Sequence, residues 1–309
     1  LILNNKKNIL IVGGTGFIGY HLAVKCLNKG WKVTSISTKL PKTIRYLSKV
    51  NYIICDIANK KSLVKKVKKN FDYVVNLGGH VDHSNKKKTF LSHYIGCKNL
   101  AEVFKKKNIK AFVQMGSCIE NGKLKSPQIE NLTSRSSSIK SIYGKAKLLS
   151  SIYLLKLYKN NNFPCVILRL YLAYGPKQDV NRFIPIITNG CIRNTTFPCS
   201  KGDQLRDFIY ISDVVDAIIK SLRSKKAKGQ IINIGTGKPK KIKDLINYIK
   251  KVTKGGQPEF GKIKYRKDEM IKLYPKISKA KNLIGWKPKV SFNNGLKRTI
   301  KYYYETIGR

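Results

Sequence analysis

Acidic residues are scarce in this chain, and long apolar runs are missing. Only 16 of the 309 residues are Asp or Glu, against 63 Lys or Arg, which gives a formal net charge of +47. The longest mainly apolar stretches, such as residues 165–173, fall short of the ~18 to 20 residues that a membrane-spanning helix needs. The N-terminal stretch has no long apolar core or small-residue cleavage site. We expect a soluble, unexported, cytoplasmic protein with no membrane partner.

Paired cysteines are also absent. The seven cysteines are scattered without a CxxC pair, so neither a disulfide framework nor a zinc site is indicated, and a reducing compartment fits best. His80, His83 and His93 are close in sequence, but no further Cys or His cluster completes a ligand set. We therefore expect no metal.

The positive charge comes mostly from lysine, with 53 Lys and 10 Arg spread along the whole chain. Base recognition and bidentate phosphate contacts favour Arg, whereas diffuse Lys attracts polyanions without sequence preference. A solvated lysine surface is therefore favoured over specific nucleic-acid binding, which stays open as an alternative. Such a surface also concentrates anionic substrates.

Short runs rich in Ile and Val alternate with amphipathic helical stretches up to about residue 175. This rhythm predicts an α/β fold, a Rossmann-type doubly wound parallel sheet. Strands are expected at residues 8–12, 32–37, 51–56, 73–77, 111–117 and 165–171, and helices at 16–29, 60–70, 86–107 and 141–158. Beyond this part we expect helices at 181–189 and 241–252, a helix capped by Ser212 or Asp213, and a strand at 230–234. The predicted division is a dinucleotide-binding domain at 1–175 and a smaller substrate lobe at 176–309, with some exchange of strands and helices.

The segment GGTGFIG, at residues 13–19, directly follows the first predicted strand and opens a helix. Gly13, Gly14 and Gly16 let the backbone turn tightly and approach a pyrophosphate, while the helix N-terminus offers amides and a partial positive charge. Gly19 lets helix and strand pack closely. Strand, turn and helix together indicate dinucleotide binding rather than a tight turn alone.

The position about twenty residues downstream, where an acid would hold the adenosine ribose, carries Ser37, followed by Thr38 and Lys39, with Arg45 nearby. Hydroxyls and cations do not repel a 2′-phosphate, so we expect NADP to be preferred over NAD. Asp56, at the end of the third strand, is expected either to receive the adenine amino group or to cap a helix.

Tyr143 and Lys147 are four residues apart on a predicted helix, so both project from one face. An ammonium beside the phenol, with an oxidised nicotinamide, is expected to lower the pKa of the tyrosine by ~2 to 3 units from about 10. Ser117 ends the fifth predicted strand, where an open α/β sheet places its ligand; a turn-forming serine is the alternative. Its hydroxyl can bond a substrate oxygen while Tyr143 moves the proton and the nicotinamide the hydride.

With these residues in view, the chain resembles an extended short-chain dehydrogenase/reductase of the nucleotide-sugar epimerase/dehydratase family, over nearly its whole length. The matching pieces are GGTGFIG at 13–19, CDI at 55–57, MGSCIENG at 115–122, YGKAK at 143–147, LRLYLAYGP at 168–176, RDFIYISD at 206–213, NIGTG at 233–237 and KISKAKNLIGWKP at 276–288.

The resemblance implies a catalytic triad of Ser117, Tyr143 and Lys147. It also implies that Arg206, Arg266 and Glu269 contact the nucleotide diphosphate or ribose, with Asn181 nearby. Two arginines suit a diphosphate, although exposed arginines without a ligand are the alternative. The expected cofactor-binding set is Gly13, Gly14, Gly16, Phe17, Ile18, Gly19, Ser37, Thr38, Lys39, Asp56, Ile57, Leu77, Tyr143 and Lys147.

Relatives that dehydrate a sugar place an Asp-Glu pair just after the catalytic hydroxyl, where this chain has Cys118 and Ile119. Dehydration is therefore not expected. Glu120 stands where 4-keto-sugar reductases and epimerases of the family have an acid, while His93 replaces a frequent Asn and Asn121 a frequent Tyr. The predicted NADP preference favours a 4-keto-sugar reductase, with a 4-epimerase as the alternative. A basic nucleic-acid-binding or scaffold protein on the same fold, and a reductase of small non-sugar carbonyls, also remain open.

The predicted helices at 86–107 and 141–158 carry more apolar residues than one buried stripe needs. In the family two such helices pair with those of a second subunit, so we expect a homodimer. A wider core within one chain is the alternative.

Overall fold

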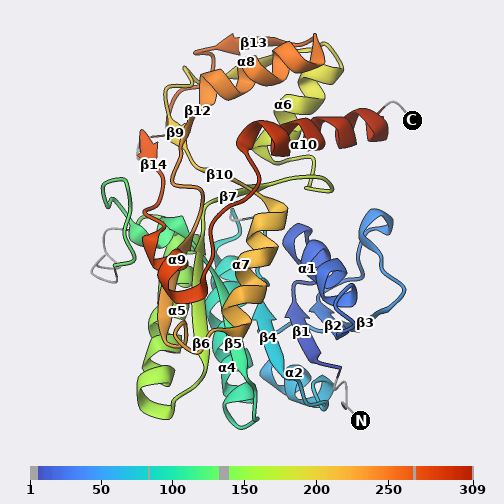
Figure 1. Cartoon of the computed structure of the whole chain (residues 1–309), viewed down its shortest axis with the longest axis vertical. Coiled ribbons are helices and arrows are strands. Elements are labelled where there is room, and N and C mark those ends of the chain that lie inside the picture. Colours follow the sequence, from blue (N-terminus) through green and yellow to red (C-terminus); the bar gives the residue numbers. More distant parts are fainter. Residues whose placement is uncertain (1–5, 83, 132–138, 267–268, 308–309) are drawn as a thin grey trace.

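A sheet of seven parallel strands lies at the centre of the computed structural model, which describes residues 6–82, 84–131, 139–266 and 269–307. The strand order is β11-β6-β5-β4-β1-β2-β3 (Figure 1), so the first strand lies inside the sheet and the chain winds outward in both directions. The strands are β1 (Asn8–Val12), β2 (Lys32–Ser37), β3 (Val50–Ile54), β4 (Tyr73–Asn76), β5 (Ala111–Ser117), β6 (Cys165–Leu170) and β11 (Gln230–Ile234). The predicted fold class is confirmed.

Helices cover both faces of a parallel sheet, so its strands need apolar side chains on both sides. The continuous β-branched and apolar runs of this sequence meet that need and form the strands. Ile9 pairs with Val33 of β2 on one side and with Tyr73 of β4 on the other, in parallel register. Every residue of β4 and β5 is buried. The carboxyl ends of β1, β4 and β5 therefore meet at one edge of the sheet.

Helices cover both faces of the sheet. Helices α1 and α7 pack against each other on one face, and α2, α4 and α5 cover the other (Figure 1). Their bounds are α1 (Phe17–Leu27), α2 (Lys60–Lys66), α4 (Gly96–Lys105), α5 (Ile142–Asn161) and α7 (Ile211–Arg223). Helix α3 (Lys86–Phe90) runs into α4 through the π-helical segment η2 (Leu91–Ile95).

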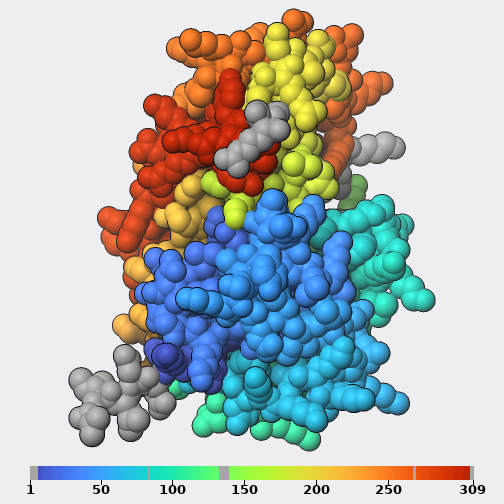
Figure 2. All heavy atoms as spheres, turned by 90° about the vertical axis from the view of Figure 1, so that its right-hand side faces the viewer, coloured from blue at the N-terminus to red at the C-terminus, as the bar shows by residue number. Residues whose placement is uncertain are grey.

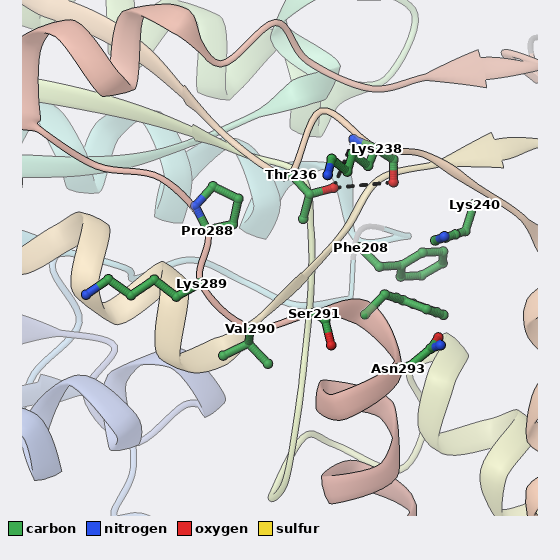
Figure 3. A pocket seen from close by; sticks show the side chains of 10 residues that line it. Phe208, Thr236, Lys238, Lys240, Pro288, Lys289, Val290, Ser291 and Asn293 are labelled. Carbon is green, nitrogen blue, oxygen red and sulfur yellow. Dashed lines mark hydrogen bonds between the residues drawn. The ribbon is translucent and has the colours of Figure 1, made fainter.

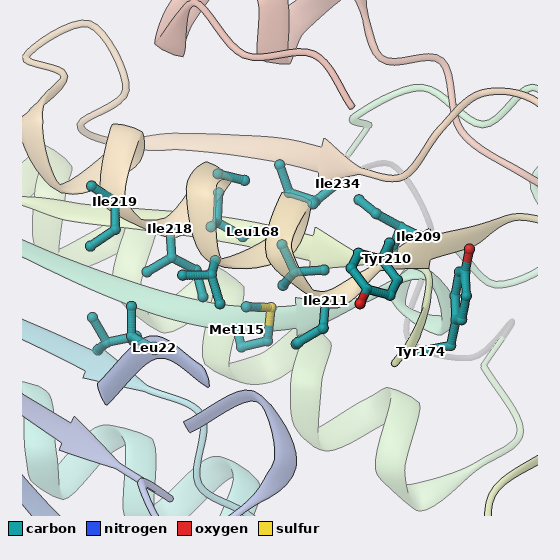
Figure 4. Packing of buried hydrophobic residues seen from close by; sticks show 14 of the residues in the cluster. Leu22, Met115, Leu168, Tyr174, Ile209, Tyr210, Ile211, Ile218, Ile219 and Ile234 are labelled. Atoms are coloured by element: carbon teal, nitrogen blue, oxygen red, sulfur yellow. The ribbon is translucent and has the colours of Figure 1, made fainter. Parts of the chain in front are cut away.

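Two apolar clusters sit on the two faces of the sheet. The first joins Leu22 of α1, Met115 and Leu168 of the strands, and Ile218 of α7 (Figure 4). The second includes Leu10, Leu100 and Phe112, all wholly buried, with Leu154 of α5. Both clusters use side chains from sequence segments far apart, so the sheet and its two helix layers are stabilised together.

The later segments build a smaller lobe beyond the carboxyl edge of the sheet. It contains α6 (Phe183–Ile192), α8 (Ile242–Thr253), α10 (Phe292–Ile307) and three small sheets: β7 (Leu172–Tyr174) with β10 (Phe208–Tyr210), β9 (Leu205–Arg206) with β12 (Lys240–Lys241) and β14 (Lys272–Leu273), and β8 (Thr196–Cys199) with β13 (Gln257–Phe260). On the face that Figure 2 shows, N-terminal segments (blue to cyan) form the lower part and later segments (yellow to red) the upper part. Strand β11, helix α7 and helix α9 (Ser278–Ile284), although late in the sequence, return to the first sheet.

Some element bounds differ from the predicted ones. The helix predicted at 60–70 ends at Lys66, because Lys107 Nζ donates to the carbonyls of Val67 and Lys69 and so satisfies them outside a helix. The prediction that Ser212 or Asp213 caps a helix is wrong: α7 starts at Ile211, and the Asp213 carboxylate instead accepts N–H bonds from Lys289 and Val290. Among the described residues, no helix is long and apolar enough to cross a membrane.

Candidate active site

Ser117 is the last residue of β5 and lies at the carboxyl edge of the sheet. Its Oγ accepts the N–H of Ile119 at 3.5 Å and caps the short helix η3 (Cys118–Asn121). Strand β4 lies between β1 and β5, so Ser117 shares this edge with the glycine turn that follows β1. Both alternatives for Ser117 therefore apply, since it forms a turn and stands where an α/β sheet places its ligand.

Helix α5 carries the other two predicted residues of the triad in its first two turns. The Ser141 side chain caps α5 by accepting the N–H of Gly144 at 3.1 Å. Lys147 is buried and its Nζ donates to the Met115 carbonyl at 2.7 Å, next to the end of β5. The same Nζ lies 5.8 Å from the centroid of the Tyr143 ring, and the Tyr143 phenol is hydrogen-bonded with Ser117. The fold therefore brings Ser117, Tyr143 and Lys147 together.

In the chain alone the pKa of the Tyr143 phenol is raised, whereas the lowered pKa expected from the sequence included an oxidised nicotinamide beside the phenol. Burial raises the pKa of Tyr143 from an ordinary 10.0 to about 12; the hydrogen bond with Ser117 and the charge of Arg182 oppose this shift. Burial also lowers the pKa of the Lys147 ammonium, while the Glu120 carboxylate raises it. The chain alone therefore keeps Tyr143 protonated at neutral pH, because removing the phenol from water disfavours the phenolate.

Because its pKa is raised, Tyr143 is expected to lose its proton only at strongly alkaline pH. The tyrosinate absorbance of the wild type minus that of Tyr143→Phe is expected to have its midpoint near 12. Because the folded pKa exceeds that of the unfolded chain, stability should be lost as the pH rises from about 10 to 12, by about 3 kcal/mol relative to Tyr143→Phe. A difference midpoint at or below 10 would contradict the burial of this phenol.

His93 packs directly against the tyrosine. Its ring meets the Tyr143 ring edge to face, with centroids 4.9 Å apart, and its Nε2 is 3.1 Å from the His80 carbonyl oxygen. A Cβ at Gly79, where φ is +153°, would lie 1.8 Å from this ring, so only glycine fits. His83, the third histidine of the group, lies outside the described residues. The sequence signal for His93 was its departure from the frequent Asn of the family.

The glycine turn between β1 and α1 fits a dinucleotide. A Cβ at Gly19 would come within 2.4 Å of the Gly13 carbonyl oxygen, and one at Gly14 within 2.3 Å of Ser35 Oγ, so the turn tolerates no side chain there. Gly16 begins α1 without a side-chain acceptor for the first amides, which leaves the helix N-terminus suited to a phosphate. The backbone at Leu77 and Gly78 packs against Gly13, and the Ile57 side chain lies beside Gly78. Phe17 and Ile18 form the first turn of α1.

The residues expected to contact the adenosine end lie after β2 and β3. Ser37 donates to the Ile36 carbonyl, while Thr38 and Lys39 are exposed. Arg45 is buried: it donates to the Lys177 carbonyl at 3.0 Å and pairs with Asp179 at 3.0 Å, so its guanidinium is held by contacts within the chain. Asp56 is exposed and accepts the N–H of Ala58, whereas Asn59 caps α2, so Asp56 is not the helix cap.

Three of the four predicted substrate residues lie near one another. Arg206 on β9 forms an ion pair with Glu269, whose N–H donates to the carbonyl of Arg266. Arg206 also acts electrostatically on Cys118, next to Ser117, and Met270 and Leu273 pack with Cys118. This segment of the later lobe therefore approaches the end of β5. The side chains of Arg266 and Asn181 are exposed.

The sequence singled out Glu120 as a position where related reductases and epimerases have an acid, but did not predict that it is buried beside the site. Glu120 has no exposed surface, and its carboxylate bonds the Ser117 amide and the Arg169 guanidinium. An arginine inside the apolar strand β6 was the available signal, since a buried charge needs a partner.

A pocket of about 410 Å³ lies elsewhere, between the loop after β11 and the start of α10 (Figure 3). Its walls include Phe208, Thr236, Lys238, Lys240, Lys289 and Phe292. None of the predicted site residues lines this pocket, so we do not assign the substrate to it.

The chain matches the model of the NAD dependent epimerase/dehydratase family over residues 9–235, about three quarters of its length. The chain belongs to this family. The resemblance recognised in the sequence is confirmed, and with it a family of NAD-dependent enzymes.

Relatives within the family carry out different reactions. A putative UDP-glucose 4-epimerase of Methanocaldococcus jannaschii is 28% identical over 95% of this chain and 97% of its own length. A UDP-N-acetyl-alpha-D-glucosaminuronate decarboxylase of Bacillus cytotoxicus is 27% identical over 97% of this chain and 98% of its own. The solved structure of UDP-glucuronic acid 4-epimerase from Bacillus cereus, in complex with UDP-glucuronic acid and NAD, superposes with a TM-score of 0.85 at 26% identity, covering 97% of this chain and 99% of the other.

Proposed function

We propose that this protein moves a hydride at C4 of a nucleotide-diphosphate sugar and that the net reaction is 4-epimerisation. The observation that carries the proposal is the meeting of Ser117, Tyr143 and Lys147 at the sheet edge, beside a glycine turn that fits a dinucleotide. The nicotinamide of bound NAD supplies the hydride acceptor and donor. The chain's own residues bind the sugar and move its hydroxyl proton.

Tyr143 is the group that exchanges the proton with the C4 hydroxyl in this proposal. Ser117 donates a hydrogen bond to the same substrate oxygen and holds it near the phenol. Lys147 has three N–H donors, of which one is used on the Met115 carbonyl. Its ammonium lies 5.8 Å from the centroid of the Tyr143 ring, and a cation so near a phenol favours the phenolate that forms when the proton leaves.

Dehydration is left out of the proposal because the two positions directly after Ser117 do not carry the Asp-Glu pair that dehydrating relatives have there. Cys118 and Ile119 follow Ser117. Burial raises the pKa of the Cys118 thiol to about 12, so it stays protonated, and Ile119 does not titrate.

Epimerisation is favoured over net reduction. The expectation of a reductase rested on an NADP preference to which Arg45 contributed, and Arg45 is committed to Lys177 and Asp179. The 4-epimerases among the relatives support the same choice. A 4-keto-sugar reductase remains the second candidate, because Ser37, Thr38 and Lys39 present no acid to a 2′-phosphate.

The two reactions differ in cofactor use. We expect the full chain, incubated with NAD and a panel of UDP-hexoses and UDP-hexuronic acids, to convert one sugar into its C4 epimer without net change in NADH absorbance. Consumption of NADPH in proportion to reduction of a 4-keto sugar, with no epimer formed from any UDP-sugar, would assign the reductase instead.

The cofactor preference is expected to depend on Lys39. We propose that NADP binds about as tightly as NAD, because Lys39 attracts a 2′-phosphate and Ser37 stands where an acid would repel it, while Arg45 is held by Lys177 and Asp179. Lys39→Glu should weaken NADP binding about tenfold relative to NAD, which corresponds to ~1.4 kcal/mol. Titration of both cofactors against wild type, Lys39→Glu and the exposed control Lys32→Glu measures this. A wild type that binds NAD far more tightly than NADP would overturn the proposal.

We also propose that the protein is a homodimer through α4 and α5. Ile152 of α5 is 44% exposed and Leu91, just before α4, is 37% exposed, whereas Leu148 and Leu154 are already buried within the chain. Ile152→Glu is therefore expected to convert a dimer into a monomer in light scattering at micromolar concentration. A wild-type monomer at that concentration would contradict the dimer and favour the wider internal core.

A further inference from the structure

The carboxylate of Glu120 is bonded at both oxygens next to the predicted triad. Its Oε1 accepts the backbone N–H of Ser117 at 2.7 Å. Its Oε2 accepts the hydroxyl of Ser151 at 2.7 Å and the Nε–H of Arg169 at 3.1 Å. Glu120 and Arg169 are both wholly buried, and Ser117 and Ser151 nearly so. One side chain thus joins the end of β5, helix α5 and strand β6.

These contacts reach the triad from two sides. Ser151 lies four residues after Lys147, so it shares a helix face with Lys147 and fixes the turn of α5 that follows it. The Ser117 amide belongs to the same residue whose hydroxyl meets the Tyr143 phenol. A Cβ at Gly116 would lie 2.5 Å from Glu120 Oε1, so the carboxylate rests directly on the backbone before Ser117.

The charge of Glu120 is held in place by its partner. Arg169 also donates to Asn121 Oδ1 at 2.5 Å and to the Asn131 carbonyl at 3.0 Å, so the guanidinium is itself fixed. The titratable and charged groups around Glu120 are Arg169 of β6, Tyr143 and Lys147 of α5, Cys97 of α4 and Cys118 of its own element. Burial raises the pKa of Tyr143 and the carboxylate raises it further, whereas burial lowers the pKa of Lys147 and the carboxylate opposes that shift.

We propose that Glu120 is a positioning residue for hydride transfer, whose carboxylate sets the placement of Ser117 Oγ relative to the Tyr143 phenol by binding β5 and α5 at once. The role in hydride transfer rests on the proposed function. The positioning of Ser117 does not, and it can be measured without substrate.

Glu120→Gln is the direct test, because it keeps the shape and removes the charge. We expect kcat to fall on the order of 100-fold, as for a misplacement of reacting groups by about 1 Å, with KM changed less than about threefold. Both limbs of the pH profile of kcat/KM should move to lower pH, because loss of the carboxylate lowers the pKa of Tyr143 and Lys147. Amide hydrogen exchange at Ser117 should become faster.

Ser151→Ala provides a milder variant if Glu120→Gln does not fold. It removes one bond to α5 and keeps the buried ion pair, so we expect kcat about tenfold lower, with an unshifted pH profile. Ser221→Ala is the matched control, since Ser221 is a wholly buried helix serine that donates only to Ala217 within α7. Its kcat should equal that of the wild type.

Two results would overturn the proposal. One is a folded Glu120→Gln protein with wild-type kcat, pH profile and Ser117 exchange; the other is a Ser151→Ala protein indistinguishable from Ser221→Ala. A wild type that turns over no nucleotide sugar would refute the proposed function instead. In that case faster Ser117 exchange in Glu120→Gln still supports the positioning role, and unchanged exchange refutes it.

Discussion

Tyr143→Phe is expected to lower kcat about 10³-fold, within the range that a positioned general acid or base contributes. The substitution removes only the phenolic oxygen. The ring stays against His93, and Lys147 keeps its bond to the Met115 carbonyl, so the site should remain folded. Steady-state kinetics on the C4 epimerisation measure the loss, and titration should show the Kd for NAD changed less than about threefold.

Tyr158→Phe is the matched control for this prediction. Tyr158 lies on the same helix, four turns from the site, and packs against Gly229. Its kcat should stay within twofold of the wild type. If Tyr143→Phe were to retain a tenth or more of wild-type kcat, another group would have to move the proton.

Gly19→Ala is expected to raise the Kd for NAD on the order of 100-fold, equivalent to about 3 kcal/mol of binding free energy. A Cβ at this position would meet the Gly13 carbonyl oxygen at 2.4 Å and Gly14 Cα at 2.5 Å, which are backbone atoms of the turn itself. The turn must open, and the amides at the start of α1 then move away from the pyrophosphate. The free energy of unfolding should also fall by about 1 to 3 kcal/mol, as for other overpacked sites.

Gly16→Ala is a comparison variant, because it adds a methyl group to the same turn without the close backbone contact that Gly19→Ala makes. Its Cβ would come no closer than 3.3 Å to the Gly13 carbonyl oxygen. Denaturant unfolding should therefore show a clearly smaller loss of stability than for Gly19→Ala. Equal losses of stability in the two variants would mean that the close packing at Gly19 does not hold the turn.

Much of the sheet could be predicted from the sequence because its strands are short apolar runs bounded by polar residues. The bounds of β1, β2, β5 and β11 agree with the predicted ranges. The ends of helices and strands that depend on contacts with distant residues could not be predicted from such runs. Helix α2 stops early because of Lys107, which follows it by 41 residues.

The candidate site shows the same division. Ser117, Tyr143 and Lys147 follow from a strand end and a four-residue helical spacing, and the fold brings them together. Arg45 is held by a hydrogen bond to the Lys177 carbonyl, 132 residues away, and Glu120 by a hydrogen bond from Arg169, 49 residues away. Sequence spacing reveals neither contact. The rise in the pKa of Tyr143 likewise comes from burial by the whole fold, which residue spacing does not encode.

The central claim is that hydride leaves C4 of a nucleotide sugar and returns to the same carbon within one active site. It is tested most directly with a UDP-sugar carrying deuterium at C4, incubated with the full chain and NAD in ordinary water. The account predicts a C4 epimer that retains its deuterium at C4, formed by the wild type and almost absent with Tyr143→Phe. Loss of the deuterium to solvent, or a wild type that forms no epimer from any sugar tested, would contradict it.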